Sequence, residues 1–313
     1  MATSIAFFHL VTKNDKKKPS TLDHMKYLKH GMSTALFIKD DLEIAIQNII
    51  KNSNSILECV EIWCDIPHLQ IKSMTYAKKI NDFLKVLKVS RIEYSLHAPI
   101  WDLNLASFNM KIRKESVNSI VKVIEIAGII GARIVVVHPG YFPYPFLNTA
   151  REKGRQIFYH SLDEMLSIAD KFGITLALEN MPKELWYCCK IRDFYELAER
   201  FEKLRFTLDV GHAFIGFEHD SKDRPKEETI ADFIREFKGK IVHIHISDND
   251  GKQDLHFPPG HKEGKKMGKI NFSPIFNALQ DINYKGQIIW ELWNPNNPRL
   301  FYRKCLAKIR RLS

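Results

Sequence analysis

Short runs of β-branched and other apolar residues alternate with longer segments of mixed polarity along most of this chain. Each short run ends at a polar residue, and the segment that follows has apolar residues at helical spacing. This alternation is typical of parallel β-α units, and the Val, Ile and Leu content of the runs favours strands buried on both faces. The expected strands are residues 33–38, 57–63, 92–97, 133–138, 174–179, 205–209, 240–246 and 287–291.

Helical spacing fills the intervals between these runs, most clearly over residues 40–50, 112–130 and 151–171. Gly131 and Gly173 stand where two of these helices end, and Ser273 followed by Pro274 predicts a helix start. Eight β-α units are the number that closes a barrel. The competing open sheet carries a Gly-rich phosphate fingerprint after its first strand, which this sequence lacks. The sequence therefore predicts an α/β protein with a single (β/α)8 TIM barrel.

Length and composition agree with one large domain. The chain has 313 residues, 45% of them hydrophobic, which can fill a barrel core. It has no apolar run of about 18 residues, so we expect no membrane span. Residues 5–11 are apolar but precede a Lys-rich stretch, which inverts the order of a secretory signal. We expect residues 1–24 to be a leader or expression extension, and residues 25–313, beginning at Met25, to form the barrel.

Charge and cysteine content indicate possible binding partners and the cellular compartment. A net charge of +10 favours contact with anions such as nucleic acid, sugar phosphates or a membrane surface, but the charge is spread along the chain. The odd number of cysteines and the absence of a C-x-x-C pair argue against a disulfide framework or a cysteine zinc site. We therefore expect reduced thiols in a cytoplasmic protein. The cysteines are Cys59, Cys64, Cys188, Cys189 and Cys305.

The candidate chemistry lies at the polar ends of six successive strands. In a barrel these ends converge on one mouth, where active sites are built. Any one of them alone could be a helix cap or a loop residue. Six together would place mutually repelling charges side by side unless a cation lay between them. Mixed imidazole and carboxylate ligands suit zinc, manganese, cobalt or iron better than calcium. The residues are His97, His138, Glu179, Asp209, His245 and Glu291.

Loops beyond the strands add further candidates. His212 follows Asp209 in Asp-Val-Gly-His, and Asp254 and His256 form an Asp-x-His pair. The alternative for each is an ordinary polar loop residue. His243 is expected inside the barrel below His245, either as a hydrogen-bonded interior residue or as a support for the metal ligand. His261 stays open. The remaining histidines are expected at the surface or in the leader: His9, His24, His30, His68, His160 and His219.

Seven segments in order carry a resemblance to a known superfamily. From about residue 33 to 295 the chain resembles the xylose-isomerase-like barrels, which include sugar and sugar-phosphate isomerases and epimerases as well as endonuclease IV. The resemblance implies a small-molecule sugar or sugar phosphate as partner and pairing as a homodimer. The segments are Ser95-Leu-His-Ala-Pro, Val137-His-Pro-Gly, Leu178-Glu-Asn, Leu208-Asp-Val-Gly-His, His245-Ile-Ser-Asp, Asp254-Leu-His-Phe-Pro-Pro-Gly and Trp290-Glu-Leu.

The epimerase branch, typified by D-tagatose 3-epimerase, implies one divalent metal ion (zinc, manganese or cobalt) on four residues. The matching positions are Glu179, Asp209, His245 and Glu291. The resemblance implies that the metal stabilises an enediolate while Glu179 and Glu291 act as acid and base on opposite faces of the substrate. His212 would hold a substrate hydroxyl. Trp101, together with Trp186 and Trp293, would stack on the sugar ring, or else pack within the loops.

The endonuclease IV branch implies nine residues around three zinc ions. All nine positions are filled here, by His97, His138, Glu179, Asp209, His212, His245, Asp254, His256 and Glu291. Two departures count against nucleic acid as the partner. The first-strand region reads His30-Gly-Met-Ser-Thr without the histidine of the Gly-x-His-x-Ser segment, and Ile100 replaces the aromatic residue that follows His-Ala-Pro. No basic run interleaved with aromatic residues is found. A non-catalytic metal-binding barrel is the third alternative.

Overall fold

The computed structural model describes residues 28–51, 53, 55–68, 74–87, 92–144, 146–218 and 224–312. The expected leader, residues 1–24, lies outside this range, as do His9, His24 and His219. Within the described part of the chain, no helix is both long and apolar enough to cross a membrane.

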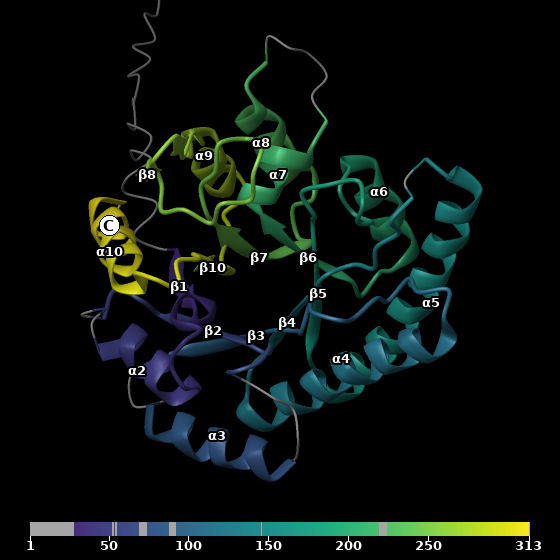
Figure 1. Ribbon diagram of the computed structural model, residues 1–313, viewed down its shortest axis with the longest axis horizontal. Coiled ribbons are helices and arrows are strands. Elements are labelled where there is room, and N and C mark those ends of the chain that lie inside the picture. The colour runs from purple at the N-terminus through teal and green to yellow at the C-terminus, as the bar shows by residue number, and fades with distance from the viewer. Residues whose placement is uncertain are drawn as a thin grey trace, which may run out of the picture.

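Eight parallel strands close into a barrel, as the sequence predicts (Figure 1). Around the ring they pair in the order β1-β10-β7-β6-β5-β4-β3-β2, so each strand lies beside its neighbours along the chain. The strands are β1 (Lys29–Ser33), β2 (Cys59–Trp63), β3 (Glu93–His97), β4 (Ile134–Val137), β5 (Thr175–Glu179), β6 (Arg205–Asp209), β7 (Ile241–Ile246) and β10 (Gln287–Trp290). The antiparallel pair β8 (Lys262–Glu263) and β9 (Lys266–Met267) lies in the loop after β7.

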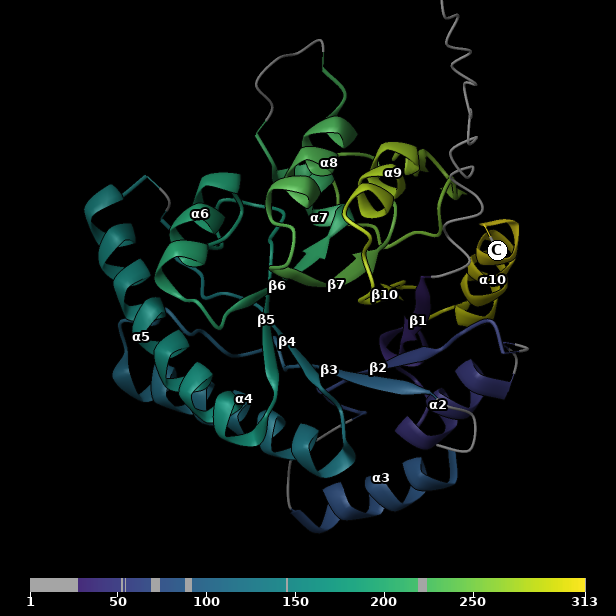
Figure 2. The same ribbon diagram turned by 180° about the vertical axis from the view of Figure 1, so that it is seen from behind.

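Helices surround the strand ring on all sides in both views (Figures 1 and 2). The predicted helix ends at Gly131 and Gly173 are confirmed, because both glycines have the positive φ that a helix C-cap needs. Asn109 caps the start of α4, and α9 begins at Ser273 with Pro274 in its first turn. The helices are α2 (Leu42–Lys51), α3 (Met74–Leu87), α4 (Met110–Ile130), α5 (Asn148–Phe172), α6 (Ile191–Arg200), α7 (Val210–Gly216), α8 (Lys226–Glu236), α9 (Ser273–Asp281) and α10 (Pro298–Leu312).

The inner and outer surfaces of the strand ring differ in polarity. Side chains alternate along a strand, so one set faces the helices and the other faces the barrel axis. Leu176 and Leu178 of β5 belong to the large apolar core between strands and helices, whereas Ala177 and Glu179 do not. The inward set is unusually polar and fully or almost fully buried, which gives the barrel a lining of hydrogen-bonding groups beneath its mouth. It includes Ser33, Glu61, Ser95, Thr207 and His243.

The predicted first strand was wrong. The strand is Lys29–Ser33, and the following segment forms the 3-10 helix η1 (Thr34–Phe37) instead of continuing it. Ser33 caps this turn by accepting a hydrogen bond from the Ala35 N–H at 3.3 Å. All four residues of η1 are buried, and a short buried apolar run does not distinguish a strand from a buried helical turn.

His30 and His68 are also placed differently from the prediction, since both are buried instead of exposed. The Trp290 Nε1–H donates to His30 Nδ1 at 3.3 Å on the outer face of β1. His68 bridges Thr34 Oγ1 and the Phe37 carbonyl, each at 3.1 Å, and so ties the loop after β2 to η1. Polar partners satisfy both imidazoles, which makes their burial tolerable.

Candidate metal centre

The six predicted strand-end residues lie together at one end of the barrel. Glu179, Asp209 and His245 are the last or nearly the last inward residues of β5, β6 and β7, and Glu291 follows β10 directly. His97 ends β3, and His138 follows β4. Five of the six are buried, and only 13% of the His138 side chain is exposed. The expected convergence of distant residues is therefore present.

Four of these residues form the central group, which we define as Glu179, Asp209, His245 and Glu291. One ligand atom from each lies within 4.8 Å of the others. His245 Nδ1 lies 3.2 Å from Glu291 Oε2, 3.5 Å from Glu179 Oε2 and 3.9 Å from Asp209 Oδ2. Three carboxylates and one imidazole therefore surround a single point, as in a four-ligand site for a divalent cation.

Two flanking groups adjoin the central group. His97 Nε2 and His138 Nε2 lie 3.4 and 3.2 Å from Glu179 Oε2, which makes Glu179 common to both groups. On the other side, Asp254 Oδ2 lies 3.0 Å from His212 Nε2 and 3.1 Å from His256 Nε2. All nine residues that the sequence singled out are thus close enough to form three connected groups.

The outer nitrogens of the imidazoles have partners that fix which ring nitrogen faces the centre. Nδ1 of His97 and His256 can donate to the carbonyls of Ala98 and Glu291, at 2.9 and 3.0 Å. His212 Nδ1 lies 2.9 Å from the Asn180 carbonyl and also 3.1 Å from Glu179 Oε1. The other nitrogen of each neutral ring then carries a lone pair and points at a carboxylate.

Lone pairs facing carboxylates are electrostatically unfavourable unless a positive charge lies between them. Both oxygens of Glu179, Asp209 Oδ2, His245 Nδ1 and His97 Nε2 are buried without a hydrogen bond among the described residues. Buried polar atoms are otherwise almost always paired, because leaving one unpaired costs about 1–3 kcal/mol. The donor set and its unpaired atoms therefore fit one or more divalent cations.

Protonation supplies the positive charge when no metal does. Burial disfavours the charged imidazole of His256, but Asp254 and Glu291 outweigh it and raise the pKa of His256 to about 10. The pKa of His245 is likewise raised well above its usual range, despite burial, by Glu61 and Glu291. Burial and neighbouring carboxylates raise the pKa of Asp209 to about 6. These shifts express the excess of negative charge that the site gathers.

One buried carboxylate near the centre was missed by the sequence reasoning. Glu61 lies in the middle of β2 and is completely buried. Its carboxylate lies 2.8 Å from His243 Nε2 and 3.2 Å from His245 Nε2. The signal was available, since an acidic residue at an inward position of a buried strand is rare without a partner. His243 was expected inside the barrel below His245, and the structure confirms that placement.

Three tryptophans lie in loops at the mouth of the barrel and differ in their contacts and exposure. Trp186, in the loop after β5, packs edge-on against His138 with ring centroids 6.0 Å apart. Trp101 is 68% exposed in the loop after β3, and Trp293 is 44% exposed after β10. Of the three, Trp186 packs on a residue of the predicted centre, so it is the best placed to contact a bound ligand.

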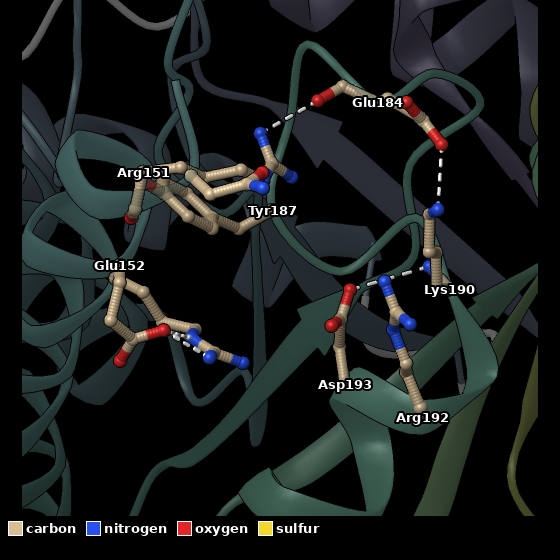
Figure 3. Close-up of a pocket in the computed structure, with 9 residues that line it drawn as sticks. Arg151, Glu152, Glu184, Tyr187, Lys190, Arg192 and Asp193 are labelled. Atoms are coloured by element: carbon tan, nitrogen blue, oxygen red, sulfur yellow. Dashed lines mark hydrogen bonds and ion pairs between the residues drawn. The ribbon is translucent and has the colours of Figure 1, made fainter. Parts of the chain in front are cut away.

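A polar cavity of about 530 Å³ lies at the start of α5 and α6, beside the loop that carries Trp186 (Figure 3). Hydrogen bonds and an ion pair across its wall hold this loop in place. The Arg151 guanidinium donates to the Glu184 and Trp186 carbonyls, both at 2.8 Å. The Tyr187 hydroxyl in turn donates to the Arg151 carbonyl at 2.7 Å. Lys190 forms an ion pair with Glu184 at 2.6 Å, which closes the cavity wall. These contacts hold the loop in the position that places Trp186 beside His138.

Comparison with known proteins assigns the chain to a family. Residues 55–312 match the family described as xylose isomerase-like TIM barrel. The protein belongs to this family. The resemblance that the sequence motifs predict is therefore confirmed, together with the TIM barrel that the family description names.

Relatives of this family member include proteins of several kinds. An uncharacterized protein of Methanocaldococcus jannaschii is 31% identical over 82% of this chain and 89% of its own length. Fructoselysine 3-epimerase of Shigella flexneri is 23% identical over 90% of this chain and 98% of its own. A protein named "Probable endonuclease 4" of Aquifex aeolicus is 30% identical over 64% of this chain and 70% of its own. The crystal structure of a D-tagatose 3-epimerase-like protein superposes with a TM-score of 0.74 and 27% identity, covering 90% of this chain and 97% of the other.

Proposed function

We propose that this protein is a metal-dependent isomerase or epimerase that acts on a ketose or ketose phosphate. The observation that carries the proposal is the central group, in which Glu179 at the end of β5 and Glu291 just after β10 reach one point. Relatives named as epimerases, over nearly the whole chain, support the same class of reaction.

The donor set supports a resident divalent cation, with zinc, manganese or cobalt as the candidates for mixed imidazole and carboxylate ligands. Glu179, Asp209, His245 and Glu291 would hold it. A cation bound there supplies Lewis-acid polarisation of a substrate carbonyl and its neighbouring hydroxyl.

The two glutamates supply the proton transfers. Each carboxylate has two oxygens, so one can serve as a ligand while the other accepts or returns a proton. One glutamate removes the proton from the carbon beside the ketose carbonyl, and the bond's electron pair moves into that carbonyl. The other glutamate returns a proton to the opposite face, which inverts the carbon without net oxidation. Such acid–base steps contribute about 10²- to 10⁴-fold each.

Solvent deuterium tests this proposal without knowledge of the product. The protein loaded with zinc, manganese or cobalt is incubated in D2O with a panel of ketoses and ketose phosphates. We expect deuterium to enter the carbon beside the carbonyl of at least one sugar. Glu179→Gln and Glu291→Gln should each reduce this exchange by at least about 10²-fold. Bound metal without exchange from any sugar would contradict the proposal and favour a non-catalytic barrel or the second candidate.

A metal-dependent phosphodiesterase of the endonuclease IV kind is the second candidate. It is favoured by the two flanking groups, because a single-cation epimerase does not need His97, His138 and Asp254 as ligands. The named endonuclease 4 relative supports the same candidate. Against it stand Ile100 after His-Ala-Pro and the position of His30, which faces outward from β1 against Trp290.

Asp254 separates the two candidates because it belongs to a flanking group alone. In the epimerase, Asp254→Asn leaves about one metal ion per chain on the central group and retains ketose exchange. In the phosphodiesterase, metal content starts near three ions per chain, and the same substitution lowers it together with cleavage of DNA at an abasic site. Elemental analysis and the two activity assays on wild type and variant give opposite results for the two candidates.

A further inference from the structure

Glu61 lies beneath the central group, where it contacts two imidazoles of β7. Its carboxylate lies 2.8 Å from His243 Nε2 and 3.2 Å from His245 Nε2, and the Ser95 hydroxyl donates to it at 3.4 Å. All four side chains are completely buried. A buried carboxylate is costly unless donors surround it, and here Glu61 Oε2 accepts from two imidazoles and a hydroxyl.

The contacts determine how the His245 ring is protonated. An ionised carboxylate can only accept hydrogen bonds, so the His245 nitrogen that faces it must carry a proton. That nitrogen is Nε2, which leaves the Nδ1 lone pair of the neutral ring directed at Glu291 and Glu179. Nδ1 has no hydrogen-bond partner among the described residues, as a ligand atom requires.

We propose that Glu61 is a positioning residue that fixes the Nε2–H form and the ring orientation of His245, so that Nδ1 is presented as a metal ligand. This inference rests on the proposed metal centre. His243 anchors the carboxylate from below through Glu61 Oε2, so the acceptor cannot swing away from His245. Carboxylates placed in this way typically strengthen metal affinity about 10- to 100-fold.

Metal affinity of Glu61→Gln tests the inference independently of turnover. Glutamine has nearly the same shape but loses the negative charge. We expect zinc affinity, measured by competition with a chromogenic chelator, to fall about 10- to 100-fold. The visible spectrum of the cobalt-loaded variant should also change, because the His245 ring is no longer held. Ser95→Ala is the matched control, since it removes a long contact to the same carboxylate without touching His245. It should bind zinc as the wild type does.

A measurement on the wild type keeps the inference testable if Glu61→Gln does not fold. In zinc-loaded protein labelled with 15N-histidine, two-bond proton–nitrogen correlations report which nitrogen carries the proton. The ring whose signals vanish in His245→Asn should show a protonated Nε2 and a metal-bound Nδ1. Coordination through Nε2, or equal zinc affinity of Glu61→Gln and wild type, would overturn the role of Glu61 alone. Failure of the wild type to bind any metal would overturn the proposed function as well.

Discussion

Asn180, which follows β5, and Asp209, at the end of β6, form two reciprocal hydrogen bonds. The Asp209 N–H donates to Asn180 Oδ1 at 2.8 Å, and Asn180 Nδ2 donates to the Asp209 carbonyl at 2.9 Å. The Asn180 carbonyl also accepts from His212 Nδ1 at 2.9 Å. One residue therefore aligns the ends of two ligand-bearing strands and the imidazole of a flanking group.

Removing this amide should weaken both the fold and the metal centre. Asn180→Ala removes the side-chain acceptor of the Asp209 N–H and a side-chain donor to the Asp209 carbonyl. A buried polar group left unpaired costs about 1–3 kcal/mol. We expect a lower free energy of unfolding for the metal-free protein in urea, and weaker zinc binding because Asp209 loses its fixed backbone. Unfolding and zinc binding that both match the wild type would show that the Asn180–Asp209 hydrogen bonds are dispensable.

Asp248 anchors the loop that carries Asp254 and His256. Its Oδ1 accepts the N–H groups of Asn249, Lys269 and Ile270 at 2.8 to 3.0 Å, and Oδ2 accepts that of Gly260 at 2.7 Å. One buried carboxylate thus joins the two ends of the loop to its middle. The Asp254 flanking group depends on this loop for its position.

Asp248→Ala should therefore loosen the loop over residues 250–270. Hydrogen–deuterium exchange of peptides from this segment should accelerate, and the Asp254 flanking group should lose metal affinity before the central group does. Asp250→Ala is a suitable control, because Asp250 accepts two N–H groups at 2.9 Å in an exposed turn two residues away. Equal exchange rates in the two variants would contradict the anchoring role of Asp248.

Arg151 donates to the Glu184 carbonyl (Figure 3) and also to the Trp186 carbonyl. Its removal should therefore free Trp186 from its contact with His138. In Arg151→Ala we expect lower steady-state anisotropy of the tryptophan fluorescence and a raised KM for the sugar that shows exchange, with a smaller effect on kcat. Arg192→Ala removes an equal charge from an exposed position of the same cavity wall. It should leave both quantities unchanged, and a matching response of the two variants would assign the effect to charge instead.

His68 predicts a pH dependence of stability away from the metal centre. Burial lowers its pKa below the ordinary value of 6.5, although the Phe37 carbonyl partly opposes this. The unfolded chain therefore takes up a proton more readily than the folded chain, and stability falls as the pH drops below about 6.5. His68→Gln should flatten the urea-unfolding free energy between about pH 7 and pH 5, relative to the wild type. An unchanged slope would show that His68 does not contribute to it.

Much of the fold and of the candidate site can be predicted from the sequence. The strand ends are visible because apolar runs stop at His97, Glu179 and Asp209, and barrel geometry brings such ends together. The first strand could not be located correctly, since the four buried residues of η1 imitate a buried strand. Glu61 was missed because its partners, His243 and His245, lie more than 180 positions away and only barrel closure makes them neighbours.

A divalent cation held by Glu179, Asp209, His245 and Glu291 underlies both proposals. Crystals of the protein loaded with zinc or manganese, measured on both sides of the metal absorption edge, would locate this cation. We expect an anomalous peak surrounded by these four side chains at about 2.0–2.2 Å. Peaks confined to other places, or none at this point despite saturating metal, would contradict it.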